Sequence, residues 1–70
     1  MGIGERLKLV RGKLSQKDFA LRLGVYWNSY ARYEREERQM DAELMAKLCR
    51  EFNVNAQWLL LGEGEMRPGE

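Results

Sequence analysis

Apolar residues recur along this chain three or four positions apart, the spacing that places side chains on one face of a helix. Val, Ile and Thr are few, and no stretch alternates steadily between apolar and polar residues, so strands are not expected. Ile3, Leu7 and Val10 share one helical face and predict a first helix. That helix is expected to end near residues 11–12, where Gly12 is a suitable stop.

A second helix is predicted after Ser15, whose side chain can cap it. Asp18 follows three residues later, as a shorter variant of the capping-box glutamate. Three apolar residues line the predicted buried face: Phe19, Ala20 and Leu23. Gly24 comes next, where a residue in the left-handed conformation would end the helix.

A third helix is predicted to begin between Trp27 and Asn28 and to run to about Arg35, with Tyr30 and Tyr33 on one face. Residues 36–40 are polar and interrupt the pattern. Asp41 can cap a fourth helix, whose apolar stripe comprises Leu44, Met45, Leu48, Cys49 and Phe52. Residues 53–55 predict a turn, and Asn55 can cap a short fifth helix that carries residues 58–61.

Seventy residues are expected to form one domain, near the small end of chains that fold alone. The apolar share of 44% and the charged share of 33% are typical of a soluble globular chain. No apolar run is long enough to span a membrane and no signal peptide heads the chain, so a cytoplasmic location without a membrane partner is expected. Cys49 is the only cysteine and there is no histidine, so neither a metal nor another cofactor is predicted.

Charge is distributed unevenly along the chain. The net charge is +1, but residues 1–23 carry +4 and residues 39–70 carry −3. A basic front and an acidic back can orient a protein on a polyanion such as nucleic acid. Ordinary surface charge is an equally good interpretation of this distribution alone.

The informative segment is QKDFALRLGVYWNSYARYER, residues 16–35, in which two short predicted helices meet at a glycine turn. Ala20 must be small, because the second helix crosses close above it. Gly24 must accept a positive φ, which costs other residues energy. Val25 and Tyr30 must be apolar to hold the two helices at a steep crossing. A helix held in this way projects from the surface and fits the major groove of DNA.

This pattern resembles the lambda-repressor/Cro-like (Xre-type) helix-turn-helix family, at positions Gln16, Ala20, Gly24, Val25, Tyr30 and Tyr33. The flanking segments IGERLKLVRG and LCREFNVNAQWLLLGEGEM agree, and the closing WLLLGEG resembles the end of the DNA-binding domain in phage-type repressors. The resemblance covers about residues 3–66. It implies an all-α, compact five-helix, lambda-repressor-like DNA-binding domain over residues 1–62, with residues 63–70 as a flexible C-terminal tail or linker.

The resemblance also implies which side chains would contact DNA. Base edges would be contacted by Trp27, Asn28 and Arg32. In the family, the residue at the position of Gln16 contacts the phosphate backbone. Further candidates for phosphate contact are Ser29, Lys17 next to Gln16, and Arg35 and Arg38 after the third helix. Asn can pair in a bidentate manner with adenine and Arg with guanine, whereas the face of Trp27 suits a thymine methyl or a sugar. Tyr26 stands where the family usually has a capping Ser or Thr, which leaves open that Asn28 caps the helix and points away from the bases.

Two further roles follow from the resemblance and from spacing. Arg11 and Glu34 resemble a pair that the family often buries as a salt bridge between the first and third helices. Successive helical residues point about 100° apart, so residues 59–61, all leucine, cannot all face inward. Leu60 and Leu61 are therefore a possible dimer interface; surface left for a C-terminal domain absent from this chain is the alternative.

The sequence thus predicts a sequence-specific regulator of transcription that binds double-stranded DNA, most simply a phage or prophage repressor that reads a palindromic operator as a homodimer. The alternative is an antitoxin-like or other protein-interaction module on the same fold. It is suggested by the aromatic pair at residues 26–27 and the acids at 36–37. An enzyme is disfavoured, since there is no histidine and no glycine-rich phosphate loop. There is also no nucleophilic residue with a general base at the spacing of a known catalytic motif.

Overall fold

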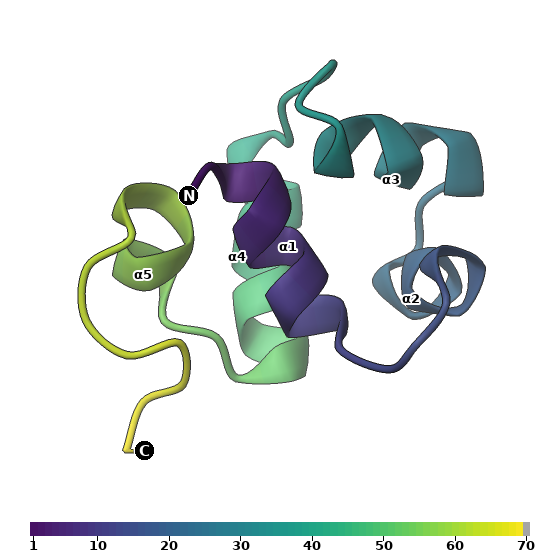
Figure 1. Cartoon of the computed structure of the whole chain (residues 1–70). Coiled ribbons are helices and arrows are strands. Elements are labelled where there is room, and N and C mark those ends of the chain that lie inside the picture. Colours follow the sequence, from purple (N-terminus) through teal and green to yellow (C-terminus); the bar gives the residue numbers. More distant parts are fainter. Residues whose placement is uncertain (70) are drawn as a thin grey trace.

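Five helices and no strand make up residues 1–69, the part of the chain that the computed structural model describes (Figure 1). The helices are α1 (Ile3–Arg11), α2 (Gln16–Leu23), α3 (Trp27–Glu34), α4 (Ala42–Phe52) and α5 (Ala56–Leu61). They pack into a body of 31 × 23 × 21 Å. The prediction of an all-helical, five-helix fold is confirmed.

Side-chain caps start three of the helices where the sequence predicts them. The Asp18 N–H donates to Ser15 Oγ at 3.0 Å, and the Leu44 N–H donates to Asp41 Oδ1 at 2.8 Å. The Gln57 N–H donates in the same way to Asn55 at 3.0 Å. Such caps satisfy N–H groups that have no partner inside the helix, and each is worth about 1 kcal/mol.

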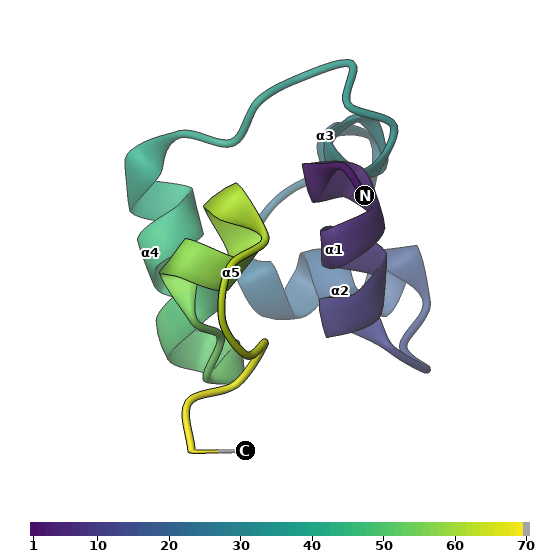
Figure 2. The ribbon, with the colours of Figure 1, turned by 60° about the vertical axis from the view of Figure 1, so that its left-hand side comes forward.

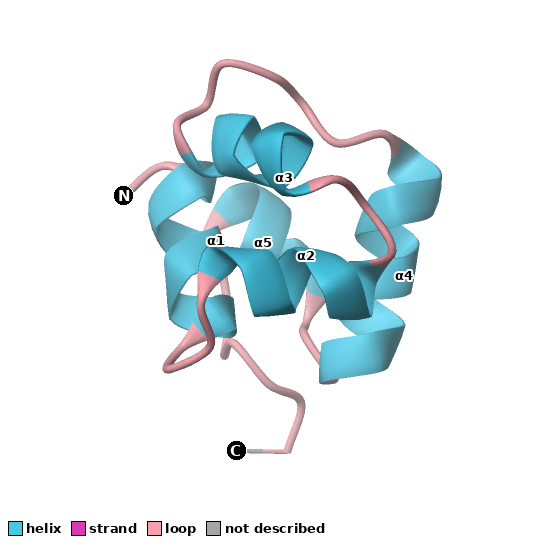
Figure 3. Cartoon of the chain, turned by 90° about the vertical axis from the view of Figure 1, so that its right-hand side faces the viewer, coloured by secondary structure: helices cyan, strands magenta, loops and turns pink. Residues whose placement is uncertain are grey.

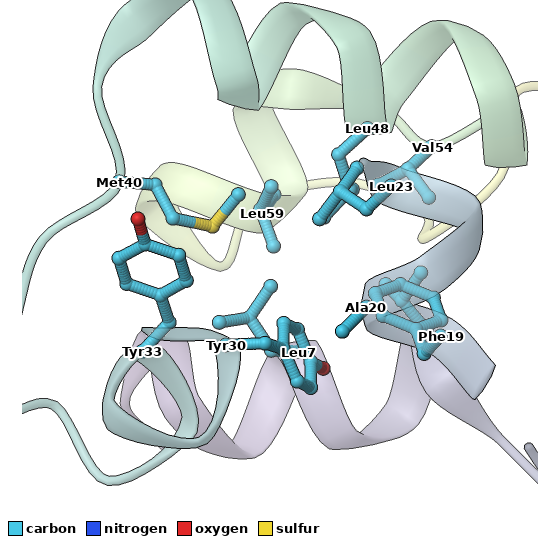
Figure 4. Packing of buried hydrophobic residues seen from close by; sticks show 11 residues of the cluster. Leu7, Phe19, Ala20, Leu23, Tyr30, Tyr33, Met40, Leu48, Val54 and Leu59 are labelled. Carbon is cyan, nitrogen blue, oxygen red and sulfur yellow. The ribbon is translucent and has the colours of Figure 1, made fainter. Parts of the chain in front are cut away.

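The core receives at least one fully buried large side chain from every helix (Figure 4). These side chains are Leu7, Phe19, Leu23, Tyr30, Leu48 and Leu59. The Phe19 ring lies 5.0 Å from the ring of Tyr30 and 4.5 Å from that of Phe52, measured between centroids. Phe19 therefore connects α2 to both α3 and α4, and burial of this cluster sets how the helices cross.

The loop between α3 and α4 differs from the polar interruption predicted for residues 36–40. Met40 is buried and belongs to the core cluster (Figure 4). Glu36 ends α3 with φ +61°, a conformation usually left to glycine or asparagine. Its carboxylate accepts a hydrogen bond from the Gly4 N–H at 3.3 Å, near the start of α1, where no side chain of α1's own cap bonds the helix.

Gly4 lies where α1 packs tightly against the end of α3. A Cβ atom at this position would collide with the backbone carbonyl oxygen of Glu34. The absence of a side chain therefore lets the first turn of α1 lie directly against the end of α3. Because α1 and α3 pack side by side, the side chain of Arg11 on α1 can reach Glu34 on α3.

The segment after α5 turns back along the domain. The Asn55 N–H donates to the Met66 carbonyl at 2.8 Å, and Arg67 Nε donates to the Phe52 carbonyl at 3.3 Å. The Met66 side chain packs against the core cluster. These contacts hold part of the expected tail, residues 63–70, against the helices.

The helices pack in a ring, in which α2 contacts α3. α1 contacts α3 and α5, while α4 contacts α2 and α5 (Figure 2). α2 and α3 lie together at the front of the molecule when it is seen from the right-hand side of Figure 1 (Figure 3). None of the helices in the described part of the chain has the length and the apolar run needed to cross a bilayer.

Candidate nucleic-acid interface

The turn between α2 and α3 has the geometry that the sequence predicts. Gly24 adopts φ 82° and ψ 29°, in the left-handed region. The Gly24 and Val25 N–H groups donate to the Ala20 carbonyl at 2.9 and 3.0 Å, which ends α2 and redirects the chain at once. Ala20 itself is buried, as the close crossing of α3 requires.

α3 has one face in the core and the other open to solvent. Tyr30 and Tyr33 are buried, whereas Asn28 and Arg32 are exposed and Trp27 is 53% exposed. In Figure 3 no other described helix or loop passes in front of α2 and α3. The backbone of residues 1–69 therefore leaves the outer face of α3 open.

The start of α3 settles which residue caps it. Tyr26 occupies the cap position with an extended backbone, and its side chain makes no capping hydrogen bond. Asn28 lies inside the first turn with its side chain exposed, so it is not the cap. A shallow hollow on this surface is lined by Tyr26, Asn28, Ser29 and Arg32.

The remaining side chains expected at the interface surround this hollow unequally. Lys17 is exposed on α2, and Ser29 is half-buried on α3. Arg38 is exposed in the loop that leads to α4. Arg35 is exposed but already paired, because its Nε and Nη2 atoms lie 2.8 and 3.2 Å from the two carboxylate oxygens of Glu37.

A buried carboxylate lies behind the exposed face. The Glu34 side chain is only 1% exposed, and Arg11 donates to both of its oxygens, from Nε at 2.7 Å and from Nη2 at 3.2 Å. Gln16 Nε2 donates to it at 2.9 Å, and the Tyr30 hydroxyl donates to it as well. Four donated hydrogen bonds from α1, α2 and α3 therefore converge on one acidic group, which locks these helices together.

This network continues to the surface through Gln16. Because a carboxylate only accepts hydrogen bonds, Gln16 must turn its amide nitrogen towards Glu34 and its amide oxygen away. That oxygen accepts a hydrogen bond of 3.4 Å from Trp27 Nε1. The first residue of α3 is thus linked to the buried carboxylate, and the indole's single donor is used within the protein.

Ionisation of Glu34 reflects these opposing influences. Burial would raise the pKa of its carboxyl, but hydrogen bonds from Arg11, Tyr30 and Gln16 outweigh burial and lower the pKa below its ordinary value. The hydrogen bond to Glu34 raises the pKa of Arg11, and burial, helped by the bond to Glu34, raises the pKa of Tyr30. Glu34 and Arg11 are accordingly both charged at neutral pH.

Stability should therefore depend on pH through Glu34. A carboxyl whose pKa is lower in the folded state stabilises the fold above its unfolded pKa of about 4.3, and that stabilisation is lost as pH falls through the folded pKa. We expect the urea midpoint of the wild type to fall as pH is lowered from about 5 to about 3. Glu34→Gln should show a shallower fall, whereas an equal fall in both proteins would contradict this assignment.

Arg6 is a key residue that sequence patterns did not single out. Its side chain is buried, although Arg6 was counted among the basic residues of the positively charged segment 1–23. Arg6 Nε donates to the Leu59 carbonyl at 2.7 Å and Nη2 to the Leu60 carbonyl at 3.3 Å, at the end of α5. A further bond of 2.6 Å joins Nη1 to the Met1 carbonyl. The available signal was position, since Arg6 lies three residues after Ile3 on the apolar side of α1.

Comparison with known proteins agrees with this geometry. The model of a helix-turn-helix domain family matches residues 4–65. The chain belongs to this family. The match spans α2, the Gly24 turn and α3, and it confirms the prediction of an Xre-type helix-turn-helix.

One relative is the "HTH-type transcriptional regulator ImmR" of Bacillus subtilis (strain 168). It is 37% identical to the chain over 62 residues, which are 86% of the chain. Those residues are 49% of the relative, so the chain spans about half the length of that protein. No solved structure gives a significant match.

Proposed function

We propose that this helix-turn-helix chain is the sequence-specific, double-stranded-DNA-binding part of a transcriptional regulator, most specifically a phage-type repressor. The observation that carries the proposal is the exposed outer face of α3, held at the Gly24 turn with polar side chains on it. The relative's name, a transcriptional regulator with the same kind of domain, supports the same conclusion. The proposed action is binding alone, which blocks access to DNA.

Three side chains on the outer face of α3 are proposed to read bases. Asn28 can donate to and accept from adenine, and Arg32 can donate twice to guanine. Trp27 differs, because its Nε1–H already bonds to Gln16. We therefore propose that Trp27 contacts DNA through its ring, against a thymine methyl or a sugar.

The phosphate backbone is proposed to lie over the start of α2 and the end of α3. The Gln16 amide nitrogen carries two hydrogens, one of which is used by Glu34, so the other can donate to a phosphate. Lys17 and Arg38 are exposed cations, and Ser29 offers a hydroxyl. Arg35 can join them after releasing Glu37.

A homodimer on a palindromic operator is proposed for the bound state. Leu59 is buried, whereas Leu60 and Leu61 at the end of α5 are 47% and 65% exposed. We propose that the same surface of a second copy covers these two side chains. To read half-sites one turn apart, such a dimer would need to hold its two α3 helices about 34 Å apart along the DNA. Sedimentation in the presence of DNA should detect the dimer. The proposal would be contradicted if the protein stayed entirely monomeric at high concentration, both with and without DNA.

A second candidate is an antitoxin-like or other protein-interaction module. Tyr26 is 85% exposed next to Trp27, and exposed aromatic side chains are common at the centres of protein interfaces. The two candidates differ in their salt dependence. Binding driven by phosphate weakens steeply as salt rises, while binding by a mainly apolar surface does not.

Selection from random duplex DNA tests the proposal. We expect the wild type to enrich one motif, and Asn28→Ala or Arg32→Ala to lose preference at one base pair each, at about 1–3 kcal/mol of discrimination. Gln57→Ala is the matched control, since it removes an exposed amide on α5, outside the α2–α3 face. Motifs that remain identical in both α3 variants would show that these residues do not read bases.

A further inference from the structure

We infer that Glu37 competes with DNA phosphate for Arg35 and so weakens DNA binding by the α2–α3 face. The inference rests on the proposed function. It gives a role to an acid that stands next to the expected phosphate contacts, a position where a negative charge opposes binding to a polyanion.

Backbone hydrogen bonds fix Glu37 beside the end of α3. The Glu36 N–H donates to the Tyr33 carbonyl at 3.1 Å, and the Glu37 N–H donates to the Arg32 carbonyl at 2.9 Å. With Glu36 in the left-handed conformation, the chain folds back over the last turn of α3. Glu37 is thereby held close to Arg35 by the main chain and not only by the attraction of its side chain.

The contact occupies one bidentate edge of Arg35, formed by Nε and Nη2, that could otherwise bind a phosphate. Glu37 Oε2 and Oε1 accept from Nε and Nη2 of Arg35, at 2.8 and 3.2 Å. A guanidinium binds carboxylates and phosphates through this same two-pronged edge. Arg35 cannot offer that edge to both anions at once, so binding a phosphate there requires the release of Glu37.

Both side chains are accessible for such an exchange. The Arg35 and Glu37 side chains are 55% and 54% exposed. Exposed ion pairs contribute little to folding, so the exchange does not threaten the fold. The hydrogen bond from Arg35 lowers the pKa of Glu37, with a smaller contribution from Arg32, so the competing carboxylate is charged at neutral pH.

The test compares Glu37→Gln with the wild type on a duplex obtained by selection and on a scrambled duplex of equal length. We expect Glu37→Gln to bind both duplexes several-fold more tightly. Its plot of log affinity against log salt should be steeper by about 0.9, the value for one additional neutralised phosphate. Glu51→Gln is the matched control, because it removes one exposed negative charge from α4.

The same measurements in an Arg35→Ala background separate competition from simple repulsion. If Glu37 acts through Arg35, Glu37→Gln should leave the salt slope unchanged when Arg35 is absent. An equal gain with and without Arg35, or equal gains from Glu37→Gln and Glu51→Gln, would overturn the inference while leaving the proposed function intact. Absence of binding to any duplex at low salt, by wild type and variants alike, would overturn both.

Discussion

Glu34→Ala is expected to lower the free energy of unfolding by about 3–5 kcal/mol, the usual cost of removing one partner of a buried ion pair. The change leaves Arg11 without its counter-ion, and it removes the acceptor used by Gln16 and the Tyr30 hydroxyl. Domains of this size are stable by roughly 4–10 kcal/mol in total, so the variant should be close to unfolding at room temperature. Urea denaturation followed by circular dichroism measures the effect.

Glu37→Ala provides the matched control for this experiment. It removes the same side chain from an exposed ion pair, and a change within about 0.5 kcal/mol is expected. A loss of less than about 1 kcal/mol in Glu34→Ala, or equal losses in the two variants, would show that the buried network is not a major source of stability.

Arg6→Met is expected to destabilise the fold by about 2–4 kcal/mol. Methionine fills much of the same space, but it cannot donate to the carbonyls of Leu59 and Leu60. A buried carbonyl without a partner is costly, and hydrogen bonds from a charged donor are worth about 1.5–3 kcal/mol. The loss should appear as a lower urea midpoint and as faster hydrogen exchange in α5.

Arg22→Met is the control for the Arg6 substitution. It makes the same chemical change at an exposed position on α2, where a small effect is expected. If both substitutions shift the urea midpoint equally, the bonds from Arg6 to α5 do not contribute as argued.

Much of the fold follows from local sequence. Ser15, Asp41 and Asn55 act as caps because their short polar side chains bond to N–H groups two or three residues ahead. Gly24 is equally local, since its left-handed backbone is a property of one residue. Such features depend on spacing along the chain, and spacing is fully visible in the sequence.

Features that depend on distant segments could not be predicted in the same way. Met40 follows four polar residues, and only the position of the loop over the core explains its burial. Arg6 reaches α5, more than fifty positions away, so its neighbours in sequence give no sign of the contact. Glu36 stands where glycine is usual, and its bond to Gly4 depends on the packing of α1 against α3.

The candidate interface likewise has some features that local sequence predicts and others that depend on how the chain folds. The turn at Gly24 and the outward position of Asn28 and Arg32 follow from the motif and from helical spacing. The partners of the interface side chains do not. Gln16 is tied to Glu34 and Arg35 to Glu37, and each pairing arises from how α3 and its following loop fold.

The link from Glu34 through Gln16 to Trp27 has a consequence for protein engineering. Grafting only the outer residues of α3 onto another scaffold would leave the indole without the amide oxygen that orients it. Gln16 and Glu34 therefore need to be transplanted together with Trp27 if a chimera is to keep the orientation of the indole.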